Sequence, residues 1–423
     1  MRTPERQQSE IGSLMESVSL YLHIPFCQAK CHYCDFNSYA GLLGLRERYV
    51  DALEAEIALA GWRARRADGQ PRRCRTIFFG GGTPSLLTTP QVARLLAASR
   101  AAFALDDDAE ITLEANPGAI ERGRFDELRA AGINRLSMGA QSFDDGLLRW
   151  MGRIHTAAEI ADALHAARAG GFDNINLDFI FALPSQTLAL WDDTLARALD
   201  LGPDHLSLYS LIVEEGTPLH RWVAQGRVRP ADDDLAADMY EQAARRLADA
   251  GYAQYEISNW ARPDRRCQHN LTYWRNLPYI GLGAGAHGWF AGRRYSEARP
   301  IRAYCERVER VVAQARDIEL ANAQTHALPA GAVVEDEAIA REAEMAETAM
   351  LGLRLVEGLD LGVWAARFGE PFFARFGPRL AEVEAAGLLE RVPADASAYG
   401  GGHIRLTERG RLLGNEVFER VLP

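Results

Sequence analysis

The chain has 423 residues, 48% of them hydrophobic and 25% charged, and its formal net charge is -11. This composition is typical of a globular protein with one large and one smaller domain. The acidic charge argues against nucleic-acid binding, which depends on clustered Lys and Arg, and no apolar run has membrane-spanning length. The first 17 residues lack the apolar centre of a secretion signal, so we expect a cytoplasmic protein.

Short apolar runs alternate with segments of helical period through the first half of the chain. Strands are predicted over Ser19 to Pro25, Thr76 to Phe79, Glu110 to Glu114, Asn134 to Met138, Asn174 to Phe181 and His205 to Val213. Helices are predicted over Leu45 to Arg66, Thr89 to Phe103, Glu121 to Ala131, Ala157 to Ala169 and Ala189 to Leu199. Strands and helices that alternate in this way form a parallel sheet. After a tail of residues 1–17, we therefore expect an α/β fold, a partial (β/α)6 barrel of the TIM type, over residues 18–231.

The pattern changes after this predicted barrel. A long amphipathic helix is predicted over Asp232 to Ala250, followed by a loop rich in His, Asn, Tyr and Trp, and by a polar, Ala-rich linker over Asn322 to Val334. These segments form a predicted extension of the barrel over residues 232–335. Residues 336–423 are predicted to form a small, mainly α, winged-helix-like domain with a glycine-turned hairpin at Gly400 to Gly402.

Three of the six cysteines lie within eight residues of each other: Cys27, Cys31 and Cys34. In a reducing compartment such a cluster indicates metal ligation rather than disulfide bonds. Three thiolates leave one iron of a [4Fe–4S] cluster without a protein ligand. That iron can bind amino and carboxylate groups, as the reductive cleavage of S-adenosylmethionine requires.

Zinc is the alternative metal for these cysteines, with His23 or His32 as the fourth ligand. Lys30, the only Lys in the chain, lies inside the cysteine segment. Its ammonium group either stabilises an anionic cluster or stands there by chance, and the sequence leaves both readings open.

Glycines and polar residues follow the predicted strands, at the barrel ends where catalytic groups collect in such folds. The run Gly80 to Gly82 either lets backbone amides approach a ligand or makes a tight turn. Glu114 and Asp178 offer acceptors, Gln141 offers a donor and an acceptor, and Arg153 can hold a carboxylate. An ordinary ion pair or cap is the alternative role for each. The clustering of these residues at strand ends favours a ligand pocket.

Together these motifs resemble the radical SAM superfamily and, within it, the oxygen-independent coproporphyrinogen III oxidase family. The likeness runs from about Val18 to the end of the chain and includes Tyr21 to Cys34, Gly80 to Ser85, Glu114 to Pro117, Gly139 to Phe143, Gly152 to His155 and Asn176 to Asp178. It implies that the three cysteines hold the cluster. It also implies that S-adenosylmethionine contacts Tyr21, Tyr33, Gly81, Gly82, Thr83, Glu114, Gln141, Arg153 and Asp178. Relatives more often have glycine where this chain has Ala182, which we expect to adopt a negative φ.

This family contains an enzyme that decarboxylates coproporphyrinogen III and also a haem chaperone. Three features of the chain resemble the chaperones. Phe36 stands where the oxidases have a further cysteine, and few residues precede the first strand. The segment from His269 to Trp274 also matches the chaperones' His-Asn-x-x-Tyr-Trp signature.

The resemblance implies that haem contacts His269, Asn270, Tyr273 and Trp274. His is a common axial ligand of haem iron, and Tyr and Trp present flat apolar faces with a polar tip. His287 is the alternative ligand. Another interpretation is that the segment only packs at the barrel mouth, with His269 hydrogen-bonded. Nearby arginines could pair with the haem propionates: Arg265, Arg266 and Arg275.

We therefore predict a haem chaperone that binds a [4Fe–4S] cluster, S-adenosylmethionine and haem. The alternative is an oxygen-independent coproporphyrinogen III oxidase. The expected partners are haem-accepting proteins and an electron donor for the cluster, with no nucleic acid. The resemblance also allows a homodimer and peripheral association with a membrane.

Overall fold

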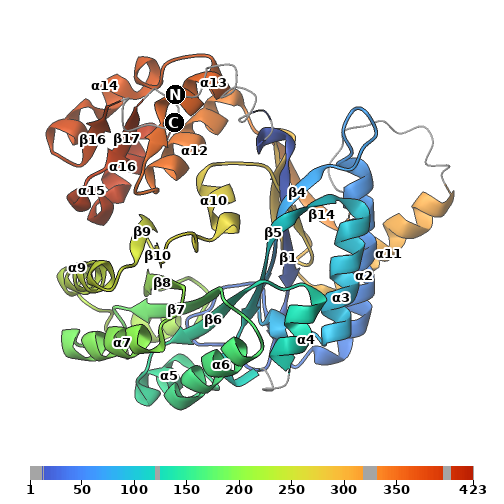
Figure 1. The fold of residues 1–423 in the computed structure, drawn as a ribbon, viewed down its shortest axis with the longest axis horizontal. Coiled ribbons are helices and arrows are strands. Elements are labelled where there is room, and N and C mark those ends of the chain that lie inside the picture. Colours follow the sequence, from blue (N-terminus) through green and yellow to red (C-terminus); the bar gives the residue numbers. More distant parts are fainter. Residues whose placement is uncertain (1–11, 13, 120–123, 318–330, 394–401, 423) are drawn as a thin grey trace.

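The computed structural model describes residues 12, 14–119, 124–317, 331–393 and 402–422 (Figure 1). Six parallel strands form the middle of its main sheet: β1 (Val18–Ile24), β4 (Arg73–Gly81), β5 (Ala104–Ala115), β6 (Arg135–Gln141), β7 (Ile175–Phe181) and β8 (His205–Ser210). Each pairs with the next in chain order. All six predicted strands are present, and the predicted α/β fold with a partial barrel is confirmed.

The helices that connect these strands lie along the outer side of the sheet (Figure 1): α2 (Arg46–Arg63), α3 (Thr89–Ala102), α4 (Arg124–Ala131), α6 (Ala157–Ala169) and α7 (Leu188–Leu201). Thr88 and Thr156 start α3 and α6 with capping boxes, a signal that is readable in the sequence. In the described part of the chain, no helix combines the length and the apolarity needed to cross a bilayer.

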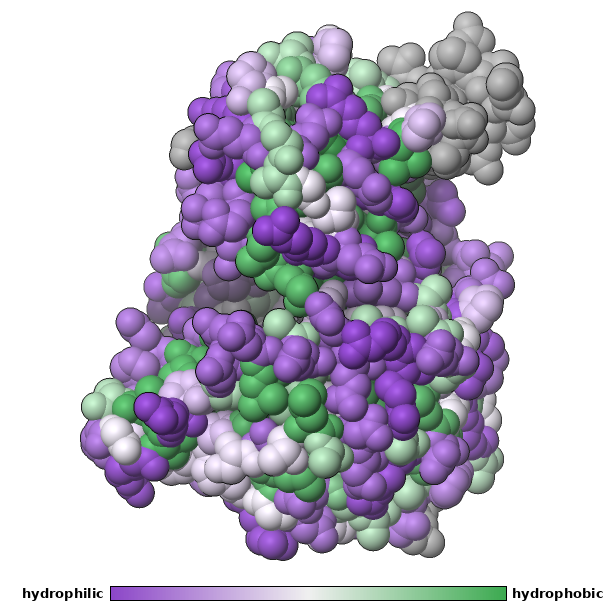
Figure 2. Space-filling view, turned by 90° about the vertical axis from the view of Figure 1, so that its left-hand side faces the viewer, coloured by the Kyte–Doolittle hydropathy of each residue, from purple (hydrophilic) through white to green (hydrophobic). Residues whose placement is uncertain are grey.

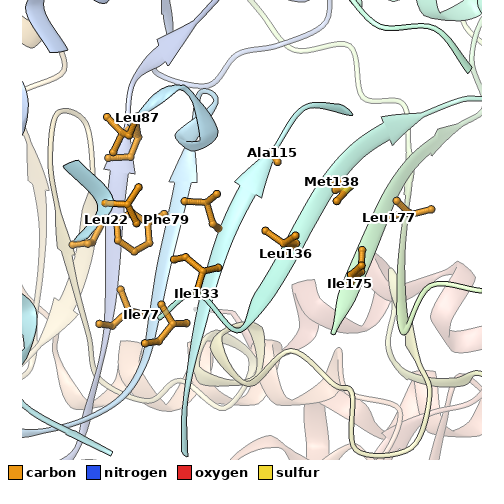
Figure 3. Packing of buried hydrophobic residues seen from close by; sticks show 14 of the residues in the cluster. Leu22, Ile77, Phe79, Leu87, Ala115, Ile133, Leu136, Met138, Ile175 and Leu177 are labelled. Atoms are coloured by element: carbon orange, nitrogen blue, oxygen red, sulfur yellow. The ribbon is translucent and has the colours of Figure 1, made fainter. Parts of the chain in front are cut away.

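The core of the sheet follows from apolar residues on consecutive strands. β6 is buried at all of its seven positions, as expected for a parallel strand covered on both faces. Figure 3 shows Leu22, Phe79, Leu136 and Leu177 from β1, β4, β6 and β7 in one continuous apolar layer. This packing fixes the strand ends that carry the polar residues of the site.

Further strands extend the sheet at both edges instead of closing a barrel. β11 (Tyr279–Leu282) pairs with β1 and is followed by three antiparallel strands, while β10 (Asn259–Ala261) and β9 (Ala253–Glu256) extend the β8 edge. The three antiparallel strands are β12 (His287–Phe290), β13 (Arg293–Glu297) and β14 (Val333–Ala338). The domain boundary predicted at residue 335 falls inside β14. This strand pairs with β13, so it belongs to the main sheet.

The C-terminal part forms a second cluster of buried apolar side chains. Its elements are α12 (Arg341–Leu353), β15 (Leu359–Asp360), α13 (Leu361–Phe368), α14 (Phe372–Ala385), β16 (Leu389–Val392), β17 (His403–Leu406), α15 (Glu408–Leu412) and α16 (Gly414–Val421). β16 and β17 are the arms of the predicted hairpin, although residues 400–401 of its predicted turn lie outside the described residues. Figure 2 shows a recess on one face, between this domain above and the barrel with α9 (Asp233–Asp249) below.

The segment that carries the His-Asn-x-x-Tyr-Trp motif is a helix, α10 (Gln268–Trp274), and the predicted loop is wrong here. The amides of Gln268 and His269 donate to the carboxylate of Glu110, each over 3.0 Å. A carboxylate that accepts from the first amides of a helix stabilises its start. Because Glu110 belongs to β5, tertiary contact sets the beginning of this helix.

The backbone at Ala182 also differs from the prediction. Its φ is +56°, in the left-handed region, whereas a negative φ was expected. The turn that follows β7 imposes this conformation, which costs a non-glycine residue about 1–2 kcal/mol. Glycine, the residue more often found here in relatives, avoids that cost.

Candidate functional site

The three clustered cysteines line one cavity of about 140 Å³ at the carboxyl ends of the parallel strands. Cys27 ends β2 (Phe26–Cys27), and Cys31 and Cys34 follow in the next loop. All three thiols are free and only half-buried. Burial raises the pKa of the Cys34 thiol, and the backbone amide of Phe36 and the Lys30 charge oppose this shift.

Lys30 stabilises the cysteine loop through two hydrogen bonds to its backbone. Its ammonium donates to the carbonyl oxygens of Phe36, over 2.9 Å, and Ser38, over 3.2 Å. Both bonds join the start of the loop to its end, so Lys30 has a structural role in addition to its positive charge near the thiols.

The histidines considered as zinc ligands have other partners. The ring nitrogens of His23 lie 3.0 Å from the Tyr21 hydroxyl and 2.9 Å from the Asn37 carbonyl oxygen. Nδ1 of His32 lies 2.7 Å from the carbonyl oxygen of Trp150. Within the described residues, no three His, Cys, Asp or Glu side chains are close enough to share a single metal ion. The ligands of a cubane cluster bind different irons, so they need not converge on one point.

The glycines after β4 are required by close approach of the chain to itself. Gly81 has a φ of +113°, and a Cβ atom there would lie 2.5 Å from the His23 ring. A Cβ atom on Gly82 would lie 2.6 Å from the carbonyl oxygen of Phe26. Only glycine fits at either position, and both residues line the cysteine cavity. Thr83, also in its wall, accepts a hydrogen bond from Asn116 over 3.0 Å.

Two carboxyl groups face the same cavity from β5 and β7. Glu114 accepts a hydrogen bond from the amide of Gly81 over 3.0 Å, and Asp178 accepts from Asn176 and Ser137. Burial, reinforced by the Asp178 charge, raises the pKa of Glu114 to about 8. Burial also raises the pKa of Asp178. A pair of carboxyls with raised pKa values in a cavity is typical of a ligand site.

The backbone is strained where β6 ends. Gln141 has a φ of +66°, and the register between β6 and β7 shifts between Gly139 and Gln141. Strained residues and bulges concentrate at functional sites, where they redirect a side chain. Gln141 lines the cysteine cavity.

Arg153 connects this strand end to the cysteine loop. Its guanidinium donates to the carbonyl oxygen of Gly139 over 2.6 Å, to Sγ of Cys31 over 3.6 Å and to Asn116. Among the described residues, its buried Nε has no hydrogen-bond partner. Arg153 therefore has a structural role, and it also lines the cysteine cavity.

The structure brings together eight of the nine residues predicted for S-adenosylmethionine. These line the cysteine cavity: Tyr33, Gly81, Gly82, Thr83, Glu114, Gln141, Arg153 and Asp178. Tyr21 instead lines an adjacent cavity of about 330 Å³ at the barrel mouth, which shares Phe36, Gly81 and Glu114 with the first. Sequence reasoning missed Asn116 and Ser137 in the wall, although Asn116 stood in a recognised motif.

The residues predicted for haem do not share one cavity. Tyr273 lines the barrel-mouth cavity, whereas Trp274 lines a separate cavity next to the C-terminal domain. Asn270 is half-buried on α10 and lines neither cavity. Residues of the signature therefore line two different cavities and do not form one site.

His269 has no free ring nitrogen in this conformation. Nδ1 lies 2.7 Å from Oγ1 of Thr76 and Nε2 lies 2.8 Å from the Tyr273 hydroxyl. Burial, reinforced by the charge of Arg135, lowers the pKa of His269 to about 3. The hydrogen-bonded alternative describes His269 better than the role of an iron ligand.

His287, the alternative iron ligand, and the three arginines predicted to bind propionates are not on α10. His287 is exposed and lines the barrel-mouth cavity. The three arginines all pair with carboxylates: Arg265 with Asp173 at 3.2 Å, and Arg266 and Arg275 with Glu357 at 3.3 and 3.1 Å.

The chain matches two family models and several known proteins. Residues 21–198 match the radical SAM superfamily and residues 339–413 the HemN C-terminal domain. A Bacillus subtilis protein named "Heme chaperone HemW" is 36% identical over 96% of this chain and 99% of its own length. A Mycobacterium tuberculosis protein of the same name is 38% identical over 95% and 94%.

A solved structure supports the same grouping. Coproporphyrinogen III oxidase (HemN) from Escherichia coli is 26% identical and superimposes with a TM-score of 0.77 over 98% of this chain and 93% of that chain. Radical SAM proteins use a [4Fe–4S] cluster and S-adenosylmethionine. The three free thiols, with polar groups in one cavity, fit that pair of cofactors. The chain belongs to the radical SAM superfamily and, within it, to the family of the heme chaperone HemW.

Proposed function

We propose that this protein is a cytoplasmic haem chaperone, which binds haem and passes it to acceptor proteins. Similarity over nearly the full length to proteins named heme chaperone supports this function. The observation that carries the choice over an oxidase is Phe36. It occupies the position of the oxidases' additional cysteine, is 63% exposed, and lines both the cysteine cavity and the barrel-mouth cavity.

The cysteine cavity is the proposed site of the cluster and of S-adenosylmethionine. Cys27, Cys31 and Cys34 would hold three irons as thiolates. When bound, the cluster supplies the electron that cleaves the sulfonium. The carboxyl groups of Glu114 and Asp178 would accept from the ribose hydroxyls and the amino group of S-adenosylmethionine. The remaining roles fall to Tyr33, Gly81, Gly82, Thr83, Gln141 and Arg153 in the cavity wall, with Tyr21 at its edge.

Glu114 would be protonated in the empty pocket and would lose its proton when the ligand binds. With a pKa of about 8, its carboxyl is mainly protonated at neutral pH when the pocket is empty. A cationic ligand favours the carboxylate. Binding of the sulfonium would therefore release a proton from Glu114, which calorimetry in two buffers of different ionisation enthalpy measures.

We assign a separate role to each of the three segments of the chain. Residues 18–231 would hold the cluster, the extension 232–335 would supply α10 between the two cavities, and residues 336–423 would close one of these cavities. A haem-accepting protein and an electron donor are the partners this function requires. A homodimer and contact with a membrane surface would let the carrier meet acceptors at a membrane.

The second candidate is an oxygen-independent coproporphyrinogen III oxidase, favoured by the likeness to HemN over 98% of the chain. An anaerobic assay with reconstituted protein, coproporphyrinogen III, a reductant and S-adenosylmethionine separates the two functions. We expect stoichiometric haem uptake and no protoporphyrinogen. Formation of protoporphyrinogen at a catalytic rate would establish the oxidase instead.

A further inference from the structure

The barrel-mouth cavity of about 330 Å³ adjoins the cysteine cavity but has a different lining. Its wall includes the aromatic rings of Tyr21, Phe36, Tyr273 and Tyr279. Phe36 is 63% exposed, so its ring is accessible to a ligand that enters from solvent. Small-molecule sites have cavities of this size with such a lining. A planar apolar molecule can therefore reach an aromatic surface here.

Two tyrosine rings in this wall are fixed by their neighbours. The hydroxyl of Tyr273 lies 2.8 Å from Nε2 of His269. The rings of Tyr273 and Tyr279 pack edge to face, with centroids 4.7 Å apart and an angle of 85° between the planes. Aromatic pairs favour this geometry. The structural histidine of the signature thus holds a ring in the wall of the barrel-mouth cavity.

Asn37 joins three distant segments around the same cavity. Its side chain donates to the carbonyl oxygens of Ala284, over 2.8 Å, and Arg299, over 2.9 Å. Its own carbonyl oxygen lies 2.9 Å from Nε2 of His23. A Cβ atom on Gly285 would lie 2.5 Å from Nδ2 of Asn37, so the turn before β12 follows this side chain closely. The cysteine loop, that turn and the segment after β13 are therefore held together.

This arrangement brings an imidazole and a guanidinium to the cavity. His287, at the start of β12, and Arg299 are both exposed and both line it. Among the described residues, neither side chain makes a hydrogen bond or an ion pair. Burial lowers the pKa of His23 to about 4, and the charges of His287 and Arg299 add to this shift, so both groups act on one ring in the wall. A free imidazole can bind iron, and a free guanidinium can bind a carboxylate.

We propose that the barrel-mouth cavity is the haem site, with His287 on the iron and Arg299 at a propionate. The exposed ring of Phe36 and the ring of Tyr279 supply the aromatic surface for the porphyrin. The lining sets this ligand class: a planar apolar body, a carboxylate and a metal that accepts imidazole. The inference rests on the proposed haem function. It places haem next to the cysteine cavity, with iron and propionate partners that the cysteine cavity does not use.

Histidine variants and two porphyrins test the iron ligand. Haem and iron-free protoporphyrin IX are each titrated into the full-length wild type, His287→Ala and His165→Ala, following the Soret band. We expect His287→Ala to shift the Soret band of bound haem and to bind haem about ten-fold more weakly, because the axial ligand is lost. Protoporphyrin IX has no iron to coordinate and should bind this variant and the wild type equally. His165→Ala, at an exposed position on α6, should match the wild type in both titrations.

An arginine variant tests the propionate partner. Arg299→Glu should bind haem and protoporphyrin IX about ten-fold more weakly, because both carry propionates that lose a charged hydrogen bond. Arg302→Glu makes the same charge change at an exposed position on α11 (Ile301–Asp317) outside the cavity, and should bind as the wild type does. Circular dichroism confirms that each variant is folded.

Two results would overturn the inference. One is a wild-type Soret band and haem affinity in folded His287→Ala. The other is equal haem affinity in folded Arg299→Glu and Arg302→Glu. A wild-type protein that binds no haem would instead refute the proposed function itself.

Discussion

Nε2 of His269 lies 2.8 Å from the hydroxyl oxygen of Tyr273, one helical turn further along α10. Nδ1 of the same ring lies 2.7 Å from Oγ1 of Thr76 on β4. The imidazole thus joins the extension to the central sheet. Its two bonds explain how a histidine in a haem-carrier signature can be structural.

His269→Ala is expected to leave the spectrum of bound haem unchanged and to destabilise the protein. The substitution removes two hydrogen bonds and leaves the buried hydroxyl of Thr76 and the partly buried hydroxyl of Tyr273 unpaired, which costs about 2 kcal/mol of unfolding free energy. Urea unfolding and a haem titration measure the two effects. His165→Ala, an exposed position on α6, serves as the control. A shifted Soret band in folded His269→Ala would restore it as an iron ligand.

Cys31→Ser is expected to lose the cluster and to keep haem binding. Anaerobic reconstitution of the wild type should give about four irons per chain, and the variant should retain much less because one of only three thiolate ligands is gone. Iron analysis and the visible absorption of the cluster provide the measurement. Cys305→Ser, a buried position on α11 (Ile301–Asp317), should reconstitute normally. If haem binding is also lost in Cys31→Ser, the two sites are not separate.

Glu114→Gln is expected to change how stability depends on pH. The folded pKa of Glu114, about 8, lies above its ordinary value of 4.5 because of burial and the Asp178 charge. Between these values the folded state holds a proton that the unfolded state has released, so this group's stabilisation is lost as pH rises. Urea unfolding of the ligand-free protein from pH 5 to 8 should show a shallower decline for Glu114→Gln than for wild type. Parallel curves would mean that Glu114 has an ordinary pKa.

Ala182→Gly is expected to stabilise the protein slightly. Glycine relieves the strain of φ +56°, worth about 1–2 kcal/mol, but it makes the unfolded chain more flexible. The net gain in unfolding free energy should be about 0.5 kcal/mol, visible as a higher Tm. Ala166→Gly in the middle of α6 should instead lose about 1 kcal/mol, because glycine weakens a helix interior. A lower Tm for Ala182→Gly would show that the turn does not strain alanine.

Local patterns determined much of this fold. The six strands and their connecting helices were predictable because apolar period and capping residues such as Thr88 and Thr156 act over a few positions. The three cysteines were recognisable as candidate cluster ligands for the same reason, since one short loop carries all three. Their neighbours in the cavity were recognisable as motifs at strand ends, where a parallel sheet brings them together.

The character of α10 was decided by distant residues. Its start is capped by Glu110, and Nδ1 of its His269 lies against Thr76, two residues that are far away in the chain. No local pattern could therefore predict the helix or identify the distant hydrogen-bond partner of His269. The separation of Tyr273 and Trp274 into two cavities likewise depends on where the C-terminal domain packs. The sequence by itself determined the strands, the connecting helices and the candidate residues, because these depend on neighbouring positions, and long-range packing decided which of the candidates share a cavity.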